Sequence, residues 1–302
     1  MEKVLKGKVV AKEILENLRE EIANLKYKGV GPLLAIFIVG DNPASDYYSK
    51  NIIKAGNKIG INTRMISFEQ DVQEDELIKQ IEVTNVDKSV SGILLQMPLP
   101  LHLRIDKVIM SISPQKDVDG LHPLNAGKLL LGKDCFMPCT PAAILELIKF
   151  YNIKTDGEKV VVLGRSNTVG KPLGNLLLRK CEYANATVTI CHSHTKNLEE
   201  TTKAADILIS AIGIPYFVTE KMVKKDSIII DVGINRIFDK KSEQYKFVGD
   251  VDYESVFEKV KAITPVPGGV GSITTATLLS NVVKAAIWSS PQLNWGVSRL
   301  KC

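Results

Sequence analysis

The sequence predicts an α/β protein of two domains, each built on a parallel sheet. In the first half, apolar runs at residues 33–39, 64–68 and 92–96 alternate with helical patterns near 43–60 and 73–84. This βαβ order is typical of parallel strands covered by helices. In the second half a helix is predicted over 142–151, and the apolar runs that follow it span residues 159–163, 187–191, 207–210 and 227–232. A chain of 302 residues is long enough for two domains of ordinary size.

A tract rich in proline and glycine, residues 97–141, lies between the two halves and contains one short helix predicted near 105–110. Long irregular segments of this kind usually carry function. Near the end of the chain a Gly-rich turn leads into a helix predicted over 273–288, and residues 289–302 are predicted to form a loosely ordered tail.

Composition disfavours several functional classes. The net charge of +5 is spread without a basic stripe, which argues against nucleic acid and suits a phosphate-bearing small molecule. No apolar run approaches the roughly 20 residues that span a bilayer, and no signal or transit peptide is evident, so no membrane association is expected. Five cysteines without a CxxC pair predict reduced thiols in a cytoplasmic protein. No metal site is predicted, because His192 and His194 lack carboxylate partners at suitable spacing.

The second half carries a candidate phosphate-binding turn, GRSNTVGKP at residues 164–172, between its first strand and the next helix. Glycines let a backbone approach phosphate, and a helix N-terminus offers unpaired N–H groups. On pattern alone, a βα turn without any ligand is an equal alternative, since the spacing is not GxGxxG. The next strand ends in CHSHT, residues 191–195, with no acid to bind the ribose of NAD. Because Arg165 and Ser193 are available for a 2′-phosphate, NADP is predicted rather than NAD.

Three polar side chains of the first half are candidates for binding. Tyr48 lies on a helix expected to begin at Pro43, and Ile52 shares its helical face. Gln96 ends a predicted strand, at the edge where open α/β sheets face their ligands. Asp119 stands in KDVDGLH directly before a glycine, a sequence that by itself indicates only a turn.

These motifs together resemble the methylenetetrahydrofolate dehydrogenase/methenyltetrahydrofolate cyclohydrolase family. The resemblance covers roughly residues 3–288 and also includes, in order, PCTP (138–141), SAIGIP (210–215), DVGIN (231–235), VGDVD (248–252) and TPVPGGVGSIT (264–274). It implies a folate-binding catalytic domain of residues 1–139 plus 270–302, with the last helix packed back on it. The remaining residues, 140–269, would form a Rossmann-type NAD(P)-binding domain, with a cleft between the two. A homodimer acting on one-carbon derivatives of tetrahydrofolate is also implied.

The resemblance assigns roles to single residues. It implies catalytic roles for Tyr48, Gln96 and Asp119, with the Asp119 carboxylate hydrogen-bonded to the pterin ring. The residues expected to bind the folate are Tyr48, Gln96, Pro98, Leu99, Asp119, Pro267, Gly268 and Gly269. The residues expected to bind the dinucleotide are Gly164, Arg165, Ser166, Val169, Gly170, Pro172, His192, Ser193, Thr195, Ala211, Gly213, Gly233, Ile234, Asn235, Gly271 and Thr274.

One departure from the family pattern affects the chemistry. Four residues after Tyr48 the family has a catalytic lysine, and this chain has Ile52; Ala143 and Ser272 also replace an expected glycine and proline. Hydride transfer mainly requires two aligned rings, whereas hydrolysis of the methenyl product requires an acid-base group.

The sequence therefore predicts NADP-dependent oxidation of 5,10-methylenetetrahydrofolate to 5,10-methenyltetrahydrofolate in one-carbon metabolism, with cyclohydrolase activity weak or lost. One alternative is a fully bifunctional enzyme that makes 10-formyltetrahydrofolate. The other is a non-catalytic paralogue that binds folate or dinucleotide without turnover.

Overall fold

A computed structural model describes residues 2–239 and 243–290, which form two compact units. One unit contains residues 13–139 and 275–290, and the other contains 2–12 with 140–239 and 243–274. Residues 2–12 thus group with the second half of the chain, because Leu5 N–H donates to the Ile263 carbonyl at 2.9 Å and Gly7 N–H to the Gly268 carbonyl at 2.9 Å. It stays a prediction that folate binds one domain and the dinucleotide the other. The cleft between these domains is also a prediction. The predicted tail falls mostly at residues 291–302, outside the described part of the chain.

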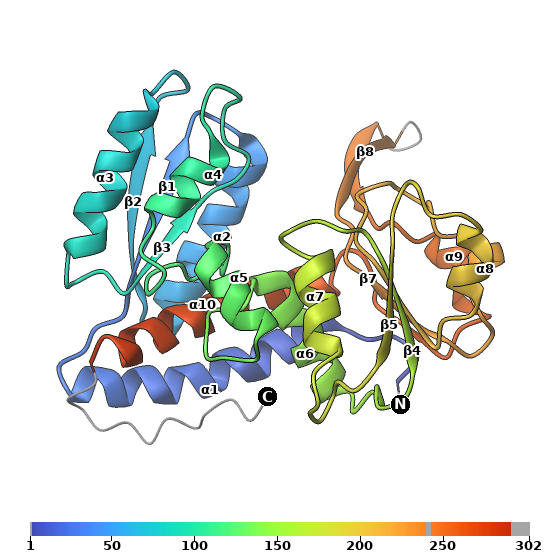
Figure 1. Cartoon of the computed structure of the whole chain (residues 1–302). Helices are drawn as coiled ribbons and strands as arrows, with labels where there is room; N and C mark the ends of the chain where they lie inside the picture. The colour runs from blue at the N-terminus through green and yellow to red at the C-terminus, as the bar shows by residue number, and fades with distance from the viewer. Residues whose placement is uncertain (1, 240–242, 291–302) are drawn as a thin grey trace. The chain divides into compact units, whose positions relative to one another are not determined.

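The unit of residues 13–139 and 275–290 contains a three-stranded parallel sheet in the order β2-β1-β3. Its elements, with α1 and α10 each beginning in the other unit, are α1 (Gly7–Tyr27), β1 (Leu33–Val39), α2 (Pro43–Ile59), β2 (Asn62–Phe68), α3 (Glu74–Val86), β3 (Gly92–Leu95), α4 (Ile105–Ser111), α5 (Pro123–Leu130) and α10 (Val270–Trp288) (Figure 1). Alternate residues of β1 enter two different cores. Leu34 and Ile36 pack with residues of α1, α2 and α10, whereas Ala35 and Phe37 pack with α3 and α4. Burial on both faces explains the unbroken apolar sequence of this strand.

The other unit contains a five-stranded parallel sheet in the order β10-β7-β6-β4-β5. Its elements are α6 (Cys139–Phe150), β4 (Lys159–Leu163), α7 (Gly170–Leu177), β5 (Thr187–Cys191), α8 (Leu198–Lys203), β6 (Ile207–Ser210), the 3-10 helix η1 (Glu220–Met222), β7 (Ile228–Asp231), β8 (Asn235–Asp239), β9 (Gln244–Val248), α9 (Tyr253–Phe257) and β10 (Ala262–Ile263). The chain adds β5 on one side of β4 and then β6 on the other. This reversal of direction is the feature that defines a Rossmann-type sheet, so the predicted fold class is confirmed.

Several elements were not predicted from the sequence. Helix α5 lies inside the tract expected to be irregular; Pro123 occupies its first turn, and His122 Nδ1 caps it by accepting from Leu124 N–H at 3.0 Å. The hairpin β8–β9 and strand β10 were also missed. The hairpin exposes most of its residues and β10 has only two, so neither has a long apolar run.

Two expectations from composition, on apolar segments and on reduced thiols, can be compared with the structure. Helix α10 is long and apolar enough to cross a membrane by length and composition, but 61% of its apolar window is buried in the protein, as in the core helix of a soluble protein. The expectation of reduced thiols is confirmed for Cys135, Cys139 and Cys191, which are free and buried. It is wrong for Cys181, which is disulfide-bonded. Residue spacing could not indicate this bond, because disulfide pairing depends on which residues the fold brings together.

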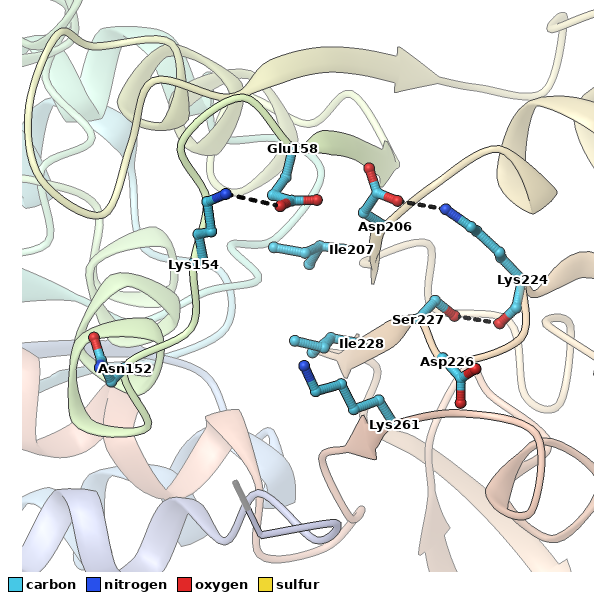
Figure 2. Close-up of a pocket in the computed structure, with 10 residues that line it drawn as sticks. All are labelled: Asn152, Lys154, Glu158, Asp206, Ile207, Lys224, Asp226, Ser227, Ile228 and Lys261. Atoms are coloured by element: carbon cyan, nitrogen blue, oxygen red, sulfur yellow. Dashed lines mark hydrogen bonds and ion pairs between the residues drawn. The ribbon is translucent and has the colours of Figure 1, made fainter.

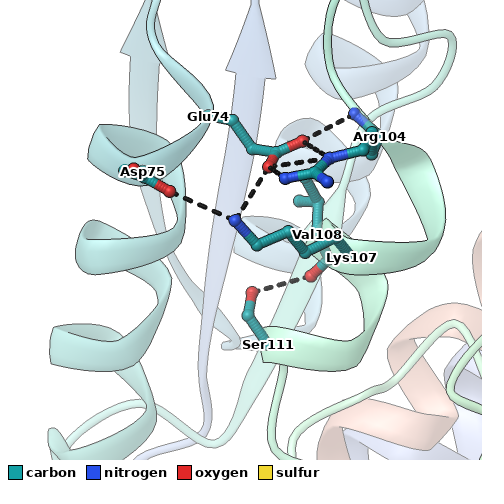
Figure 3. Close-up of polar contacts among 6 residues, drawn as sticks. All are labelled: Glu74, Asp75, Arg104, Lys107, Val108 and Ser111. Carbon is teal, nitrogen blue, oxygen red and sulfur yellow. Dashed lines mark hydrogen bonds and ion pairs between the residues drawn. The ribbon is translucent and has the colours of Figure 1, made fainter.

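An ion-pair cluster joins the first turn of α3 to the start of α4 (Figure 3). The Glu74 carboxylate accepts from the Arg104 guanidinium at 2.6 Å and from the Arg104 backbone N–H at 2.8 Å, and Lys107 Nζ lies 2.9 Å away. The hydrogen bonds from Arg104 and then from Lys107 hold the pKa of Glu74 well below its ordinary value. A carboxylate with a lowered pKa stabilises the fold above its unfolded pKa, and that contribution is lost as the pH falls through its folded pKa.

We expect Glu74→Gln to lower the urea midpoint of unfolding at pH 7. The difference from wild type should shrink as the pH falls below about 4, where the unfolded glutamate becomes protonated, and should also shrink in 1 M salt. Glu76→Gln is the matched control, since Glu76 lies in the same helical turn and is exposed. An equal loss for both variants, or a loss independent of pH, would contradict a specific role for the cluster.

Candidate functional site

The predicted dinucleotide-binding residues lie mostly at one edge of the five-stranded sheet. They follow the carboxyl ends of β4, β5, β6 and β7, which point the same way because the strands are parallel. In open α/β sheets, ligands bind outside these ends, at the point where the strand order reverses. Here that point lies between β4 and β6. The structure therefore gathers four separated motifs beside the position at which this fold holds its cofactor.

The turn after β4 is compact enough to require glycine at two positions. Gly164 has a φ of +115°, and a Cβ added there would lie 2.4 Å from the Ala211 carbonyl oxygen, on the loop after β6. A Cβ on Gly170 would lie 2.0 Å from the Gly164 carbonyl oxygen. Ser166 Oγ accepts from the N–H of Val169 at 3.0 Å and so orders the entry to α7. Arg165 and Ser166 remain exposed, so the turn presents its side chains to solvent beside a helix N-terminus.

The segment after β5 is ordered by its own hydrogen bonds. His192 N–H donates to Thr195 Oγ1 at 2.9 Å, and Thr195 N–H donates back to the His192 carbonyl at 2.9 Å. Ser193 and His194 are exposed on this turn, and no carboxylate stands among residues 192–195. A ribose bearing a 2′-phosphate fits such an edge better than one with free hydroxyls, since hydroxyls would need an acceptor there.

A buried carboxylate, Asp250, organises the loops after β6 and β7. It is fully buried and accepts from Ile212 N–H at 2.8 Å, Ile214 N–H at 3.1 Å and Asn235 Nδ2 at 3.0 Å. Ser210 Oγ and the N–H of Gly213 are also donors to it, at 3.1 and 3.3 Å. VGDVD is one of the motifs that carry the family resemblance, but the resemblance assigns no role to Asp250. The sequence signal that could have identified Asp250 is an acidic residue between Gly and Val, after a short apolar run.

Asp231, at the end of β7, supports Asp250 in turn. Its carboxylate accepts from the backbone N–H groups of Gly233 at 2.9 Å, Asp250 at 3.0 Å and Val251 at 2.9 Å. Burial raises the pKa of Asp231 to about 6, against the lowering effect of these bonds. The hydrogen bonds of the two aspartates therefore hold the predicted cofactor residues Gly213, Gly233 and Asn235 in place without a bound ligand.

The remaining predicted residues of this unit belong to the turn before α10. Gly268 has a φ of +106°, and a Cβ on Gly269 would lie 2.5 Å from the Pro265 carbonyl oxygen. Gly271 is exposed beside Ile234, whose Cδ1 would lie 2.9 Å from an added Cβ, and Thr274 Oγ1 donates to the Val270 carbonyl at 3.3 Å. Pro172 is buried in α7. Of the predicted folate residues, Pro267, Gly268 and Gly269 therefore lie in a different compact unit from Tyr48, Gln96 and Asp119.

In the other unit, Tyr48 and Asp119 interact electrostatically. Burial raises the pKa of Tyr48 far above its ordinary value, with smaller contributions from Cys139 and Asp119, while a hydrogen bond with Thr275 of α10 opposes the shift. Burial likewise raises the pKa of Asp119 to about 6, although its side chain keeps part of its surface accessible. The structure thus brings together a tyrosine and a carboxylate that the sequence separates by 71 positions, as the numbering shows.

The loop that carries Asp119 is shaped by a second, buried aspartate. The Asp117 carboxylate accepts from Leu121 N–H at 3.0 Å, His122 N–H at 2.8 Å and Asn125 Nδ2 at 2.8 Å. Gly120 has a φ of +67°, and a Cβ there would lie 2.6 Å from the Pro138 nitrogen. The turn signal in KDVDGLH is therefore satisfied by Asp117 and Gly120, which leaves Asp119 available for other contacts.

Gln96 follows β3 and has an unsatisfied side-chain donor. Its backbone N–H donates to the Phe37 carbonyl at 2.9 Å, whereas its Nε2 is buried without a hydrogen-bond partner among the described residues. Buried polar groups are normally paired, so this amide is suited to donate to a ligand or an ordered water. Pro98 is exposed after it, while the side chain of Leu99 is buried against β1 and α3, which leaves its backbone for any ligand contact.

Ile52 is fully buried in the core formed by α1, α2 and α10, with Tyr48 packed against the same cluster. The helical-face prediction for Tyr48 and Ile52 is consistent with this shared packing. The lysines nearby on α2 do not replace the missing one: Lys50 is exposed and pairs with Asp46 at 2.6 Å, and Lys54 is exposed. At this position the chain offers no titratable side chain.

A cavity of about 350 Å³ lies elsewhere in the second unit and contains none of the predicted site residues (Figure 2). It is lined by residues at or just before the amino ends of β4, β6 and β7, the sheet edge opposite the candidate site. Two of its acids are paired, Asp206 with Lys224 at 2.6 Å and Glu158 with Lys154 at 3.8 Å. Across the described ranges, 2–239 and 243–290, no group of three or more His, Cys, Asp or Glu side chains is placed to hold a metal ion.

Comparison with known proteins identifies the family to which both halves of the chain are similar. The profile "Tetrahydrofolate dehydrogenase/cyclohydrolase, catalytic domain" matches residues 5–119, and the profile of the same family's NAD(P)-binding domain matches residues 138–290. The chain is 48% identical over 285 residues to the bifunctional protein FolD of Agathobacter rectalis, a match that covers 94% of this chain and 99% of the relative.

Two solved structures have the same fold. The bifunctional FolD enzyme of Campylobacter jejuni has a TM-score of 0.89 and 45% identity, with 94% of this chain and 98% of that chain covered. The Trypanosoma brucei FolD enzyme, solved with NADP cofactor and an inhibitor, has a TM-score of 0.89 and 34% identity, with 95% and 97% covered. The chain belongs to the tetrahydrofolate dehydrogenase/cyclohydrolase family.

Proposed function

We propose that this protein oxidises 5,10-methylenetetrahydrofolate to 5,10-methenyltetrahydrofolate with NADP. The observation that carries the proposal is the edge of the five-stranded sheet, where the glycine turn after β4 and the acid-free turn after β5 lie at the cofactor position of the fold. Family membership and the NADP bound to the T. brucei relative support it. In this reading Gly164, Ser166 and Gly170 approach the phosphates, and Arg165 with Ser193 holds the 2′-phosphate.

NADP, when bound, accepts the hydride from the methylene carbon of the folate. The residues of this chain have the task of alignment, which does not require a proton at the reacting carbon. The Asp119 carboxylate accepts hydrogen bonds from the pterin, Gln96 Nε2 donates to the folate, and Tyr48 packs beside it. Because Asp250 and Asp231 hold the loops after β6 and β7, the wall for the nicotinamide is formed in advance. Because alignment requires no acid-base group, dehydrogenase activity is compatible with the absence of the family's lysine.

For the second reaction, the comparisons favour a fully bifunctional enzyme over the weak or lost cyclohydrolase activity predicted from the sequence. The relatives that match the whole chain are named bifunctional. One observation of this chain favours the weakened activity: Ile52 is apolar, fully buried and without an ionisable neighbour that takes its place on α2. Hydrolysis needs an acid-base group, and its loss costs about a hundredfold to ten-thousandfold in rate.

A paired assay tests both readings. Purified protein would receive methylenetetrahydrofolate with NADP or NAD, and the methenyl and formyl products would be followed separately. Accumulation of the methenyl compound supports the weakened cyclohydrolase, whereas direct passage to the formyl product supports the bifunctional enzyme. If neither cofactor is reduced, the dehydrogenase proposal is wrong and the non-catalytic paralogue takes its place.

We expect Arg165→Ala to weaken NADP binding about tenfold to a hundredfold, because a charge-assisted hydrogen bond to the 2′-phosphate is lost. Binding of NAD, which lacks that phosphate, should not change. Lys171→Ala is the control, since it removes an exposed cation from the same turn whose Nζ donates to Asn167 at 2.7 Å. Titration calorimetry with both dinucleotides measures the effect, and equal weakening of NADP and NAD would refute the assignment.

The resemblance also leads us to propose a cytoplasmic homodimer that requires neither nucleic acid nor a membrane. Light scattering of the purified chain at several concentrations tests the stoichiometry, with twice the monomer mass of 33.2 kDa as the expected result.

A further inference from the structure

Asn281 joins two segments that are far from it in the sequence. It lies on α10, and only 8% of its surface is exposed. Its Nδ2 donates to the Val118 carbonyl oxygen at 2.8 Å and to that of Met137 at 3.1 Å. A side-chain amide carries two N–H donors, so one side chain can supply both bonds. Asn281 therefore ties the loop that contains Asp119 to the segment that leads into α6.

The Val118 carbonyl belongs to the peptide group that leads into Asp119. A peptide group is planar, so a hydrogen bond to its oxygen fixes the plane that contains the Cα of Asp119. The same oxygen lies 3.6 Å from Cys139 Sγ, but a thiol is a weak donor. The Asn281 amide is thus the stronger of the two donors to this peptide group.

The two residues before Asp119 are held by other contacts as well. The Val118 side chain is fully buried against β3, where a Cβ added to Gly92 would lie 2.3 Å from its Cγ1. The Asp117 carboxylate accepts the three hydrogen bonds from the start of α5 and the turn before it. Asn281 adds a contact from α10, on the peptide group nearest to Asp119. All of these residues belong to one compact unit.

Two other side chains of α10 donate to the same segment of the chain. Thr277 Oγ1 donates to the Cys139 carbonyl at 3.0 Å, and Lys284 Nζ donates to the Cys135 carbonyl at 2.7 Å. Positions 277, 281 and 284 are four and three residues apart, so they share one face of the helix. Asn281 is the member of this row that reaches the peptide before the candidate folate carboxylate, and Thr277 provides a natural comparison.

We propose that Asn281 is a positioning residue of the folate half-site, which comprises Tyr48, Gln96 and Asp119. Its amide holds the peptide group before Asp119, so that the carboxylate is aligned with the pterin. The alignment with a pterin rests on the proposed function. Hydrogen bonds weaken steeply with distance and angle, and a displaced Cα moves both carboxylate oxygens. Loss of the amide therefore weakens the binding of the folate and leaves that of the dinucleotide unchanged.

Binding of tetrahydrofolate and of NADP to the full-length chain, each measured by titration calorimetry, tests the proposal. In Asn281→Ala, tetrahydrofolate should bind about tenfold more weakly, the effect of one hydrogen bond, whereas NADP affinity should not change. Asn281→Gln retains an amide donor and should bind tetrahydrofolate more tightly than Asn281→Ala does. Thr277→Val is the matched control, because it removes a buried hydrogen bond from the same helical face but not the one to the Asp119 peptide. Its tetrahydrofolate affinity should equal that of the wild type.

Hydrogen exchange in the ligand-free protein gives a second readout that needs no turnover. The backbone N–H groups of Leu121 and His122 donate to the Asp117 carboxylate, so their exchange reports opening of this loop. In Asn281→Ala they should exchange about tenfold faster relative to the amides of β1, which report unfolding of the whole unit. In Thr277→Val this ratio should equal that of the wild type.

A tetrahydrofolate affinity that is unchanged in Asn281→Ala, or that falls equally in Thr277→Val, overturns the proposal. So does an exchange ratio that stays at the wild-type value in Asn281→Ala. If Asn281→Ala does not fold, Asn281→Asp decides, since it keeps the shape of the side chain without the amide donor: undiminished tetrahydrofolate binding overturns the proposal. Absence of NADP reduction by the wild-type protein would reject the proposed function, while the exchange ratio still decides whether Asn281 orders the loop.

Discussion

Replacing Ile52 with lysine is expected to raise the hydrolysis of methenyltetrahydrofolate by about a hundredfold to ten-thousandfold. The side chain at this position is fully buried and packs in the same cluster as Tyr48. A lysine there would be desolvated, which lowers its pKa towards neutrality and suits it to exchange protons with bound water. Single-turnover conversion of the methenyl compound to the formyl product measures the change.

Ile53→Lys is the matched control for Ile52→Lys. Ile53 is the next residue of α2, partly buried against the same cluster, but about 100° around the helix. It introduces the same charge with no expected gain in hydrolysis. Burial of a charge will destabilise Ile52→Lys, so the dehydrogenase rate serves as the check that the site remains folded. Unchanged hydrolysis with intact dehydrogenase activity would mean that another group, such as Tyr48 or an ordered water, carries the proton and that the chain is bifunctional without the lysine.

Asp250→Ala is expected to lower the free energy of unfolding by on the order of 3 kcal/mol, since it leaves buried donors unsatisfied. Asp250 accepts from the buried Ser210 hydroxyl, from three consecutive backbone N–H groups at Ile212 to Ile214 and from the Asn235 amide. Dinucleotide binding should weaken as well, because the loops after β6 and β7 lose the group that joins them. Urea unfolding and NADP titration measure the two effects.

Asp252→Ala is the control for Asp250→Ala. Asp252 is two residues away and partly exposed, and its side chain does not cap α9. It should change the free energy of unfolding by no more than about 0.5 kcal/mol, the usual range for surface substitutions. If both variants unfold at the same urea concentration, Asp250 does not have the organising role described above. If only stability falls and NADP binding is retained, the loops form without it and the carboxylate is structural.

The strands illustrate how much of the fold can be read from the chain. Residues 33–39, 159–163 and 207–210 are apolar without alternation, and they prove to be central or doubly covered strands of parallel sheets. Because these short runs alternate with helical patterns, they predict buried parallel strands, so their type and direction follow from sequence. Strand β10 and the hairpin β8–β9 were missed because they are very short or mostly exposed. For such segments, hydrogen bonding to neighbouring strands rather than local composition decides the conformation.

The candidate site, like the fold, contains some residues that the sequence identifies and others that only the structure reveals. Resemblance identified Tyr48, Gln96, Asp119 and the glycine turns, because each has a recognisable neighbourhood in the chain. It did not identify the groups that hold them. Asp250 serves loops that begin about 40 positions earlier, and Asn281 reaches the peptide before Asp119 from 163 positions away. Contacts over such separations leave no local pattern.

The sequence by itself determined the two parallel sheets, the edge at which the dinucleotide motifs gather, and the absence of lysine at position 52. These features depend on short apolar runs and on motifs whose residues are close in the chain. Only the tertiary structure decided that Ile52 is fully buried, that Asp250 and Asp231 are internal acceptors, and that Asn281 donates to the Val118 carbonyl. Burial and hydrogen bonding are properties of the packed chain, because they depend on which distant segments exclude water from a side chain.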